Sequence, residues 1–108
     1  RGTVSMDKKT VIERVKRYSD LVRKNFPVKK VILYGSYARG THKTHSDIDV
    51  AVVLDHVEDD FLTAETRLYQ LRRQIDVRIE PVLLEKINDK SGFLEEILKT
   101  GEIIYSSD

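Results

Sequence analysis

The sequence lacks cysteine and tryptophan altogether, and among its 108 residues it has a single methionine and two prolines. Without cysteine, the chain can have no disulfide framework, no thiolate zinc site and no cysteine nucleophile. No apolar run approaches the roughly 20 residues that a membrane-spanning helix needs. A large charge of one sign is also missing, because 19 Lys and Arg residues face 18 Asp and Glu residues. The net charge of +1 therefore gives no overall reason to bind a polyanion.

The residues that are present suit one small domain. Apolar residues make up 40% of the chain, which is enough for one modest core. Residues 1–5 precede the only methionine, Met6, and we expect them to be an expression remnant, so that residues 6–108 form a single domain. The lack of cysteine and of a signal-peptide pattern favours a cytoplasmic protein.

Apolar residues at helical spacing predict a first helix over residues 7–26, which Pro27 ends. The other side of this helix is strongly basic. We interpret this basic side as a solvated face, with a docking face for a polyanion or an acidic partner as the alternative. The apolar residues of the helix are Val11, Val15, Tyr18, Val22 and Phe26.

Strands and further helices alternate along the rest of the chain. The run IDVAVVL over residues 48–54 is typical of a strand that is buried on both faces of a sheet. The order predicts an α/β (α+β) fold, a small mixed β-sheet covered by helices. The expected elements are a strand over 28–34, a short helix from Ser36, a strand over 48–54, a helix after Asp59 and Asp60, a strand over 75–83, a helix around 93–98 closed by Gly101, and a strand over 102–105.

Two acidic residues, Asp47 and Asp49, stand at the start of the apolar strand. Because they are two residues apart, their side chains point to the same face of the strand. Carboxylates held this close repel each other, and a divalent cation relieves the repulsion. Hard oxygen ligands suit Mg²⁺, which commonly takes substrate phosphates as further ligands.

A turn with the sequence Gly35-Ser36 ends the preceding strand and begins the short helix. Free backbone N–H groups at a helix start can bind an anion, and glycine lets a phosphate approach the backbone. The Ser36 hydroxyl can donate to a phosphate oxygen, and Arg39, about one turn later, could reach the same anion.

A third acidic residue, Asp76, opens the predicted strand over 75–83. If the first two strands pair antiparallel and a helical crossover makes the third parallel to the second, Asp76 arrives at the same sheet edge as Asp47 and Asp49. Arg78 beside it offers another interpretation of Asp76, as a structural ion-pair partner. Glu80 lies on the same predicted strand face but farther from the strand start.

This pattern, Gly35-Ser36, then Asp47-Ile48-Asp49, then Asp76, resembles the DNA polymerase beta-type nucleotidyltransferase superfamily. The small size and the form GSYARG over residues 35–40 are most similar to its minimal nucleotidyltransferases, the MntA-like antitoxins that accompany HEPN-domain toxins. The resemblance covers nearly the whole chain from Met6. It implies that residues 6–108 are a single nucleotidyltransferase domain.

The resemblance implies transfer of a nucleoside monophosphate from ATP or another NTP, with AMP from ATP preferred, onto a hydroxyl of a HEPN-domain partner protein, with release of pyrophosphate. In this family pattern Asp47 and Asp49 hold two Mg²⁺ ions, and Asp76 binds the ion that activates the acceptor hydroxyl. Gly35, Ser36 and Arg39 bind the nucleotide. Catalysis by such a site consists of positioning and charge neutralisation by two metal ions.

Other interpretations remain open at this stage. The protein could be a non-catalytic binding module that neutralises a helical partner by contact, or a transferase that acts on RNA ends or a small molecule. A P-loop is excluded, because Thr41-His42 stands where Lys-Ser/Thr is required. His42 and His45 could join the two aspartates in a zinc site, although histidines in a polar loop are usually exposed. For Tyr34 and Tyr37 we expect packing, with nucleobase stacking as the alternative.

Overall fold

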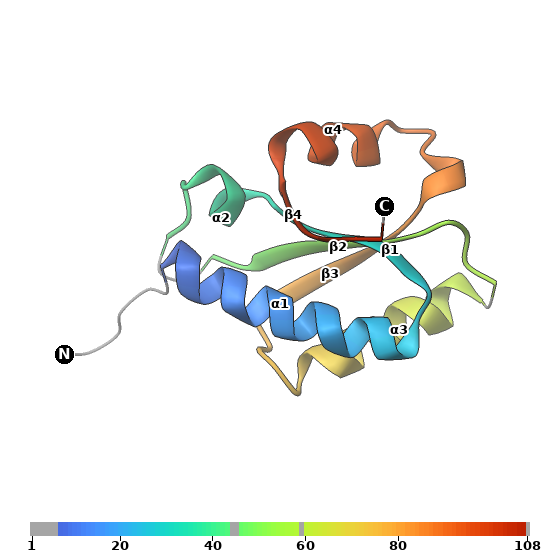
Figure 1. Ribbon diagram of the computed structural model, residues 1–108, viewed down its shortest axis with the longest axis horizontal. Coiled ribbons are helices and arrows are strands. Elements are labelled where there is room, and N and C mark those ends of the chain that lie inside the picture. Colours follow the sequence, from blue (N-terminus) through green and yellow to red (C-terminus); the bar gives the residue numbers. More distant parts are fainter. Residues whose placement is uncertain (1–6, 44–45, 59, 108) are drawn as a thin grey trace.

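The computed structural model describes residues 7–43, 46–58 and 60–107. Within these ranges the helices and strands follow one another in the predicted order (Figure 1). The elements are α1 (Lys8–Asn25), β1 (Val28–Tyr34), α2 (Ser36–Arg39), β2 (Ile48–Leu54), α3 (Phe61–Arg72), β3 (Ile79–Glu85), the 3₁₀ helix η1 (Lys86–Asn88), α4 (Phe93–Thr100) and β4 (Glu102–Ser106).

The four strands form one sheet in the order β3-β2-β1-β4. Strand β1 pairs antiparallel with β2 and with β4, whereas β2 and β3 are parallel. Parallel neighbours need a crossover connection, and α3 provides it. The sheet is therefore mixed, as predicted, and both predicted strand directions are confirmed.

Helices cover both faces of the sheet: α1 and α3 pack on one face and α4 on the other (Figure 1). The apolar run of β2 is continuous because its side chains point alternately to the two faces of the sheet, and both faces are covered. Val50 and Val52 belong to the core under α1 and α3, and Ala51 and Val53 to the core under α4. Asp49 has the same parity as Ala51, so its side chain lies on the α4 face.

Aspartate side chains begin the two longest helices. The Asp7 carboxylate accepts a hydrogen bond from the Thr10 backbone N–H at 2.9 Å, and Asp60 accepts from the Thr63 N–H at 3.1 Å. Both are helix N-caps, in which a side-chain oxygen satisfies a free N–H of the first turn. Asp59, the other predicted cap of α3, lies outside the described residues, as do residues 1–6. None of the helices in the described ranges is long and apolar enough to cross a membrane.

The prediction for the third strand is wrong at its start. We expected a strand over 75–83, but β3 begins at Ile79 because the chain first makes two turns. The Asp76 N–H donates to the Arg72 carbonyl, and the Ile79 N–H donates to the Asp76 carbonyl. The Asp76 side chain also accepts from the Arg78 N–H at 2.9 Å. A local bond of this kind competes with strand pairing, and it places Asp76 before the strand.

Candidate active site

Asp49 and Glu80 face each other across the parallel strands β2 and β3. Asp47 directly precedes β2, two residues before Asp49. Burial raises the pKa of Asp49, and the negative charges of Asp47 and Glu80 raise it further. Asp47 and Asp49 thus lie near each other, as predicted, and the carboxylate that faces Asp49 from the neighbouring strand is that of Glu80.

The turn at Gly35 lies directly against these acids, because Tyr34 pairs with Asp49 across β1 and β2. Gly35 has φ +76°, a conformation that side chains other than glycine rarely adopt. A Cβ atom at this position would overlap the Asp49 Oδ2 atom and lie 3.1 Å from its Cγ atom. The absence of a side chain at residue 35 is therefore what lets the Asp49 carboxylate reach the start of α2.

Ser36 and Arg39 lie on α2, next to this turn. Ser36 is the first residue of the helix, and Arg39 the last. The Arg39 side chain is exposed, and its positive charge lowers the Asp49 pKa, although burial and the acidic neighbours outweigh it. The predicted nucleotide-binding residues and the acid pair are thus neighbours in space.

Asp76 does not join the other acids, which corrects the prediction that it opens β3. Its side chain is only 5% exposed, and the Arg14 Nη1 atom of α1 lies 2.7 Å from its Oδ2. Burial raises the pKa of Asp76, but hydrogen bonds from the Arg78 backbone, the Arg78 side chain and Arg14 together lower it below its usual value. The structure matches the alternative interpretation of Asp76 as an ion-pair residue.

Glu80 is held by two side chains of α3, both of which sequence reasoning missed. The Tyr69 hydroxyl donates to Glu80 Oε1 at 3.1 Å, and Arg72 Nη1 lies 3.3 Å from Glu80 Oε2. Arg72 Nη1 also donates to the Ile79 carbonyl at 2.9 Å. Tyr69 and Arg72 are three residues apart on a helix, a spacing that places them on one face. This spacing indicates from the sequence that the two side chains share a helix face, but it does not indicate which strand that face contacts.

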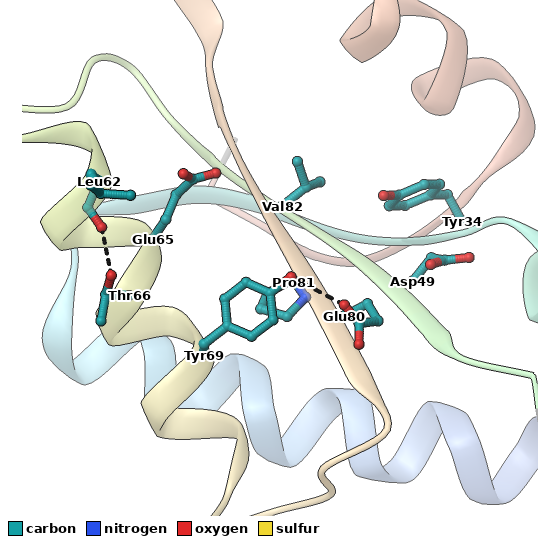
Figure 2. A pocket seen from close by; sticks show the side chains of 9 residues that line it. All are labelled: Tyr34, Asp49, Leu62, Glu65, Thr66, Tyr69, Glu80, Pro81 and Val82. Carbon is teal, nitrogen blue, oxygen red and sulfur yellow. Dashed lines mark hydrogen bonds between the residues drawn. The ribbon is translucent and has the colours of Figure 1, made fainter.

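An open cavity of about 580 Å³ lies between α3 and β3 and reaches the acids (Figure 2). Asp49 and Glu80 form part of its wall, so a molecule bound there would contact both carboxylates. Two of its three hydroxyl groups come from α3, and two of its three aliphatic side chains come from β3. The lining residues are Tyr34, Asp49, Leu62, Glu65, Thr66, Tyr69, Glu80, Pro81 and Val82.

The two tyrosines around the turn have different surroundings. Tyr37 is fully buried and its ring stacks on His42, with ring centroids 4.2 Å apart, which confirms the packing interpretation for Tyr37. Tyr34 lines the cavity and packs edge-on against Phe93 of α4 at 5.5 Å. Burial, and then the Asp49 charge, raise the pKa of Tyr34 to about 12.

The donor atoms fit Mg²⁺ better than a transition metal. Within the described ranges, no three acidic or histidine side chains converge closely enough to form a complete ligand set. Mg²⁺ does not require one, since it is usually bound by one or two carboxylates with waters and substrate phosphates. The site offers carboxylate oxygens of this kind. Of the two histidines considered for a zinc site, His42 stacks on Tyr37, and His45 lies outside the described residues.

Comparison with known proteins identifies the family of this chain. The model of the family "Polymerase beta, Nucleotidyltransferase" matches residues 16–108, most of the chain. The chain belongs to this nucleotidyltransferase family. The match includes the turn at Gly35, the acids Asp47 and Asp49, and Glu80.

Relatives and solved structures of this nucleotidyltransferase agree with the family match. MJ0604 of Methanocaldococcus jannaschii, provisionally named a protein adenylyltransferase, is 36% identical over 81 residues, which are 72% of this chain and 79% of that protein. A crystal structure of a toxin–antitoxin with AMP-PNP is 25% identical, with a TM-score of 0.66, over 86% of this chain and 74% of that chain. The fold also matches a structure of a tri-AMPylated Shewanella oneidensis HEPN toxin with its MNT antitoxin (TM-score 0.59, 20% identical, 93% and 73% covered).

Proposed function

We propose that this nucleotidyltransferase moves AMP from ATP, in a Mg²⁺-dependent reaction, onto a hydroxyl of a partner protein. One observation carries the proposal: Asp49 and Glu80 lie opposite each other on β2 and β3, with Asp47 beside them and the Gly35 turn against Asp49. A partly buried carboxylate with two acidic neighbours, next to the start of a helix whose first N–H groups have no partner within the helix, suits a metal-bound triphosphate.

Each group then has a definite task. Asp47 and Asp49 would hold Mg²⁺ ions, and a pair of ions would neutralise the charge on the attacking and leaving oxygens. Gly35, Ser36 and Arg39 would bind phosphate oxygens of the nucleotide. Glu80 takes the place that the sequence suggested for Asp76: it would lie on the acceptor side and receive the proton of the attacking hydroxyl. Asp76 is already neutralised by Arg14 and Arg78, so it is poorly suited to bind a cation.

The acceptor that we propose is a HEPN-domain toxin, which the chain would silence as an antitoxin. Support comes from the similar structures described above, a toxin–antitoxin with AMP-PNP and an MNT antitoxin with an AMPylated HEPN toxin. The name of the M. jannaschii relative points to the same reaction type.

The test is transfer in solution. The chain is mixed with ATP, Mg²⁺ and a cognate HEPN-domain protein, and the mass of that protein is measured. We expect the partner to gain AMP, and we expect the gain to disappear when Mg²⁺ is chelated or when Asp47→Asn and Asp49→Asn are combined. Asp55→Asn is the matched control, because Asp55 follows the far end of β2 and pairs with Lys29.

Two outcomes would count against the proposal. Full transfer by the double variant would show that the acids do not hold the metal. A double variant that transfers nothing but still neutralises the toxin would favour the contact-only binding module.

A further inference from the structure

The hydroxyl of Tyr69 lies next to Glu80, the carboxylate to which we assign the role of base. It donates a hydrogen bond to Glu80 Oε1 at 3.1 Å. A general base must come within about 2.6–3.2 Å of the group whose proton it removes. Glu80 is the carboxylate that we assign to the acceptor side, so the protein already presents a tyrosine hydroxyl to its own base.

The surroundings of Tyr69 leave it available for reaction. Tyr69 is 40% exposed and lines the same cavity as Asp49 and Glu80. Its hydroxyl points toward Glu80 (Figure 2). The Arg72 guanidinium lies 4.9 Å from the Tyr69 ring centroid and 3.3 Å from Glu80 Oε2. This cation would stabilise a phenolate and keeps the Glu80 carboxylate oriented toward the hydroxyl.

The phenol needs such a base. The hydrogen bond to Glu80, followed by burial and the Glu80 charge, raises the Tyr69 pKa above its usual value of 10.0. Tyr69 is therefore protonated at neutral pH, and it becomes a nucleophile only when its proton is taken up.

We propose that Tyr69 is an internal acceptor, so that the chain adenylylates itself at this residue when no partner protein is present. The inference rests on the proposed function. In the reaction the Tyr69 oxygen attacks the α-phosphorus of ATP, and the new bond is a phosphotyrosyl ester to AMP. The bond from the α-phosphorus to the bridging oxygen breaks, pyrophosphate leaves with that electron pair, and the proton goes to Glu80.

Tyr34 is the other tyrosine of the cavity, and its position is less suitable. Its ring packs edge-on against Phe93 of α4, at 5.5 Å between ring centroids. Tyr69, in contrast, comes from the α3 side and points directly at Glu80. The acceptor hydroxyl of a partner would then have to displace the Tyr69 hydroxyl from Glu80, and an AMP group on Tyr69, which lines the cavity, would obstruct it.

The experiment uses the full chain with ATP and Mg²⁺ and without any partner. Intact mass should rise by one adenylyl group, and peptide mapping should place this group on Tyr69. Tyr69→Phe should reduce the gain at least tenfold. Tyr105→Phe is the matched control, since Tyr105 lies on β4 under Arg23, and it should leave the gain unchanged. The rate per chain should not depend on protein concentration, because the acceptor and the base belong to the same molecule.

A parallel reaction with the HEPN partner separates this inference from the proposed function. Tyr69→Phe that transfers AMP to the partner but not to itself supports the inference. A wild-type chain that modifies the partner but never its own Tyr69 overturns the inference and leaves the proposed function standing. AMP on Tyr34, or a rate that rises with protein concentration, also overturns it. If neither partner nor chain gains AMP, both proposals fail.

Discussion

The Asp49 carboxylate lowers the stability of the ligand-free protein. Asp49 is partly buried beside Asp47 and opposite Glu80, and these surroundings raise its pKa above the usual 3.8. A carboxyl group whose pKa is higher in the folded chain than in the unfolded chain destabilises the fold once it is ionised. Its destabilising effect is absent below about pH 3.8 and grows as the pH rises through the raised pKa.

Asp49→Asn should therefore stabilise the metal-free protein while abolishing transfer. Like charges directly opposite on neighbouring strands cost on the order of 0.5 kcal/mol, and the amide removes one of them. Chemical denaturation of the variant and of wild type at several pH values measures the effect. The difference should be near zero below pH 3.8 and should favour the variant at pH 7. A variant less stable than wild type at pH 7 would contradict the repulsion.

Gly35→Ala tests the contact between the turn and the acid pair. The new methyl group would overlap Asp49 Oδ2 and would require a side chain at φ +76°. We expect a loss of stability of about 1–3 kcal/mol from the strained backbone. Displacement of the carboxylate by an ångström should lower transfer about 100-fold. Gly40→Ala is the control: Gly40 has a similar φ of +77°, but nothing lies within 4 Å of its Cβ position, so it should lose stability and retain more of its activity.

At the scale of elements, apolar periodicity predicted the order of helices and strands but not where β3 begins. Val77 and Ile79 continue the alternation of Ile75, so the pattern predicted one strand from 75 onward. Two turns end only at Ile79, because Asp76 makes local bonds to Arg78 and a distant ion pair with Arg14 of α1. The Arg14 contact joins residues 62 positions apart, and no local pattern could have indicated it.

Asp76→Asn and Glu80→Gln should separate structure from catalysis. The pKa of Asp76 is lower in the folded chain than its usual 3.8. The ionised carboxylate therefore stabilises the fold fully above pH 3.8, and this contribution is lost as the pH falls through the folded pKa. Asp76→Asn should cost about 2 kcal/mol at pH 7, since it leaves charged hydrogen-bond partners unpaired, and should retain transfer when folded. Glu80→Gln should fold normally and lose transfer. Thermal unfolding and partner mass measure both, and the reverse result would restore Asp76 as the third carboxylate.

For the whole molecule, apolar periodicity predicted the sheet, and the resemblance supplied most residues of the site that we propose. Gly35, Ser36, Asp47 and Asp49 could be located because they fall in two short motifs. The sequence could not show that Glu80, rather than Asp76, faces Asp49, because this pairing depends on the register of two strands about thirty residues apart. Tyr69 and Arg72 were missed because the approach of α3 to β3 is set by the packing of the whole fold.

Ligand binding should stabilise the molecule as a unit. Mg²⁺ together with a non-hydrolysable ATP analogue binds the folded state alone, and at 100 times its Kd a ligand adds about 2.7 kcal/mol. Thermal unfolding of wild type should shift upward, whereas the Asp47→Asn/Asp49→Asn double variant should not shift. An equal shift in both proteins would place the nucleotide elsewhere.

The parallel pairing of β2 with β3 also ties chemistry to the completion of folding. A slip of one residue between these strands would turn Glu80 toward the core under α1 and α3 and leave an apolar side chain facing Asp49. Contacts between distant parts of a chain form late, because the intervening loop must close first. In refolding experiments, the helical circular dichroism signal should return before transfer activity does. The return of activity then reports when β2 and β3 have paired in the correct register.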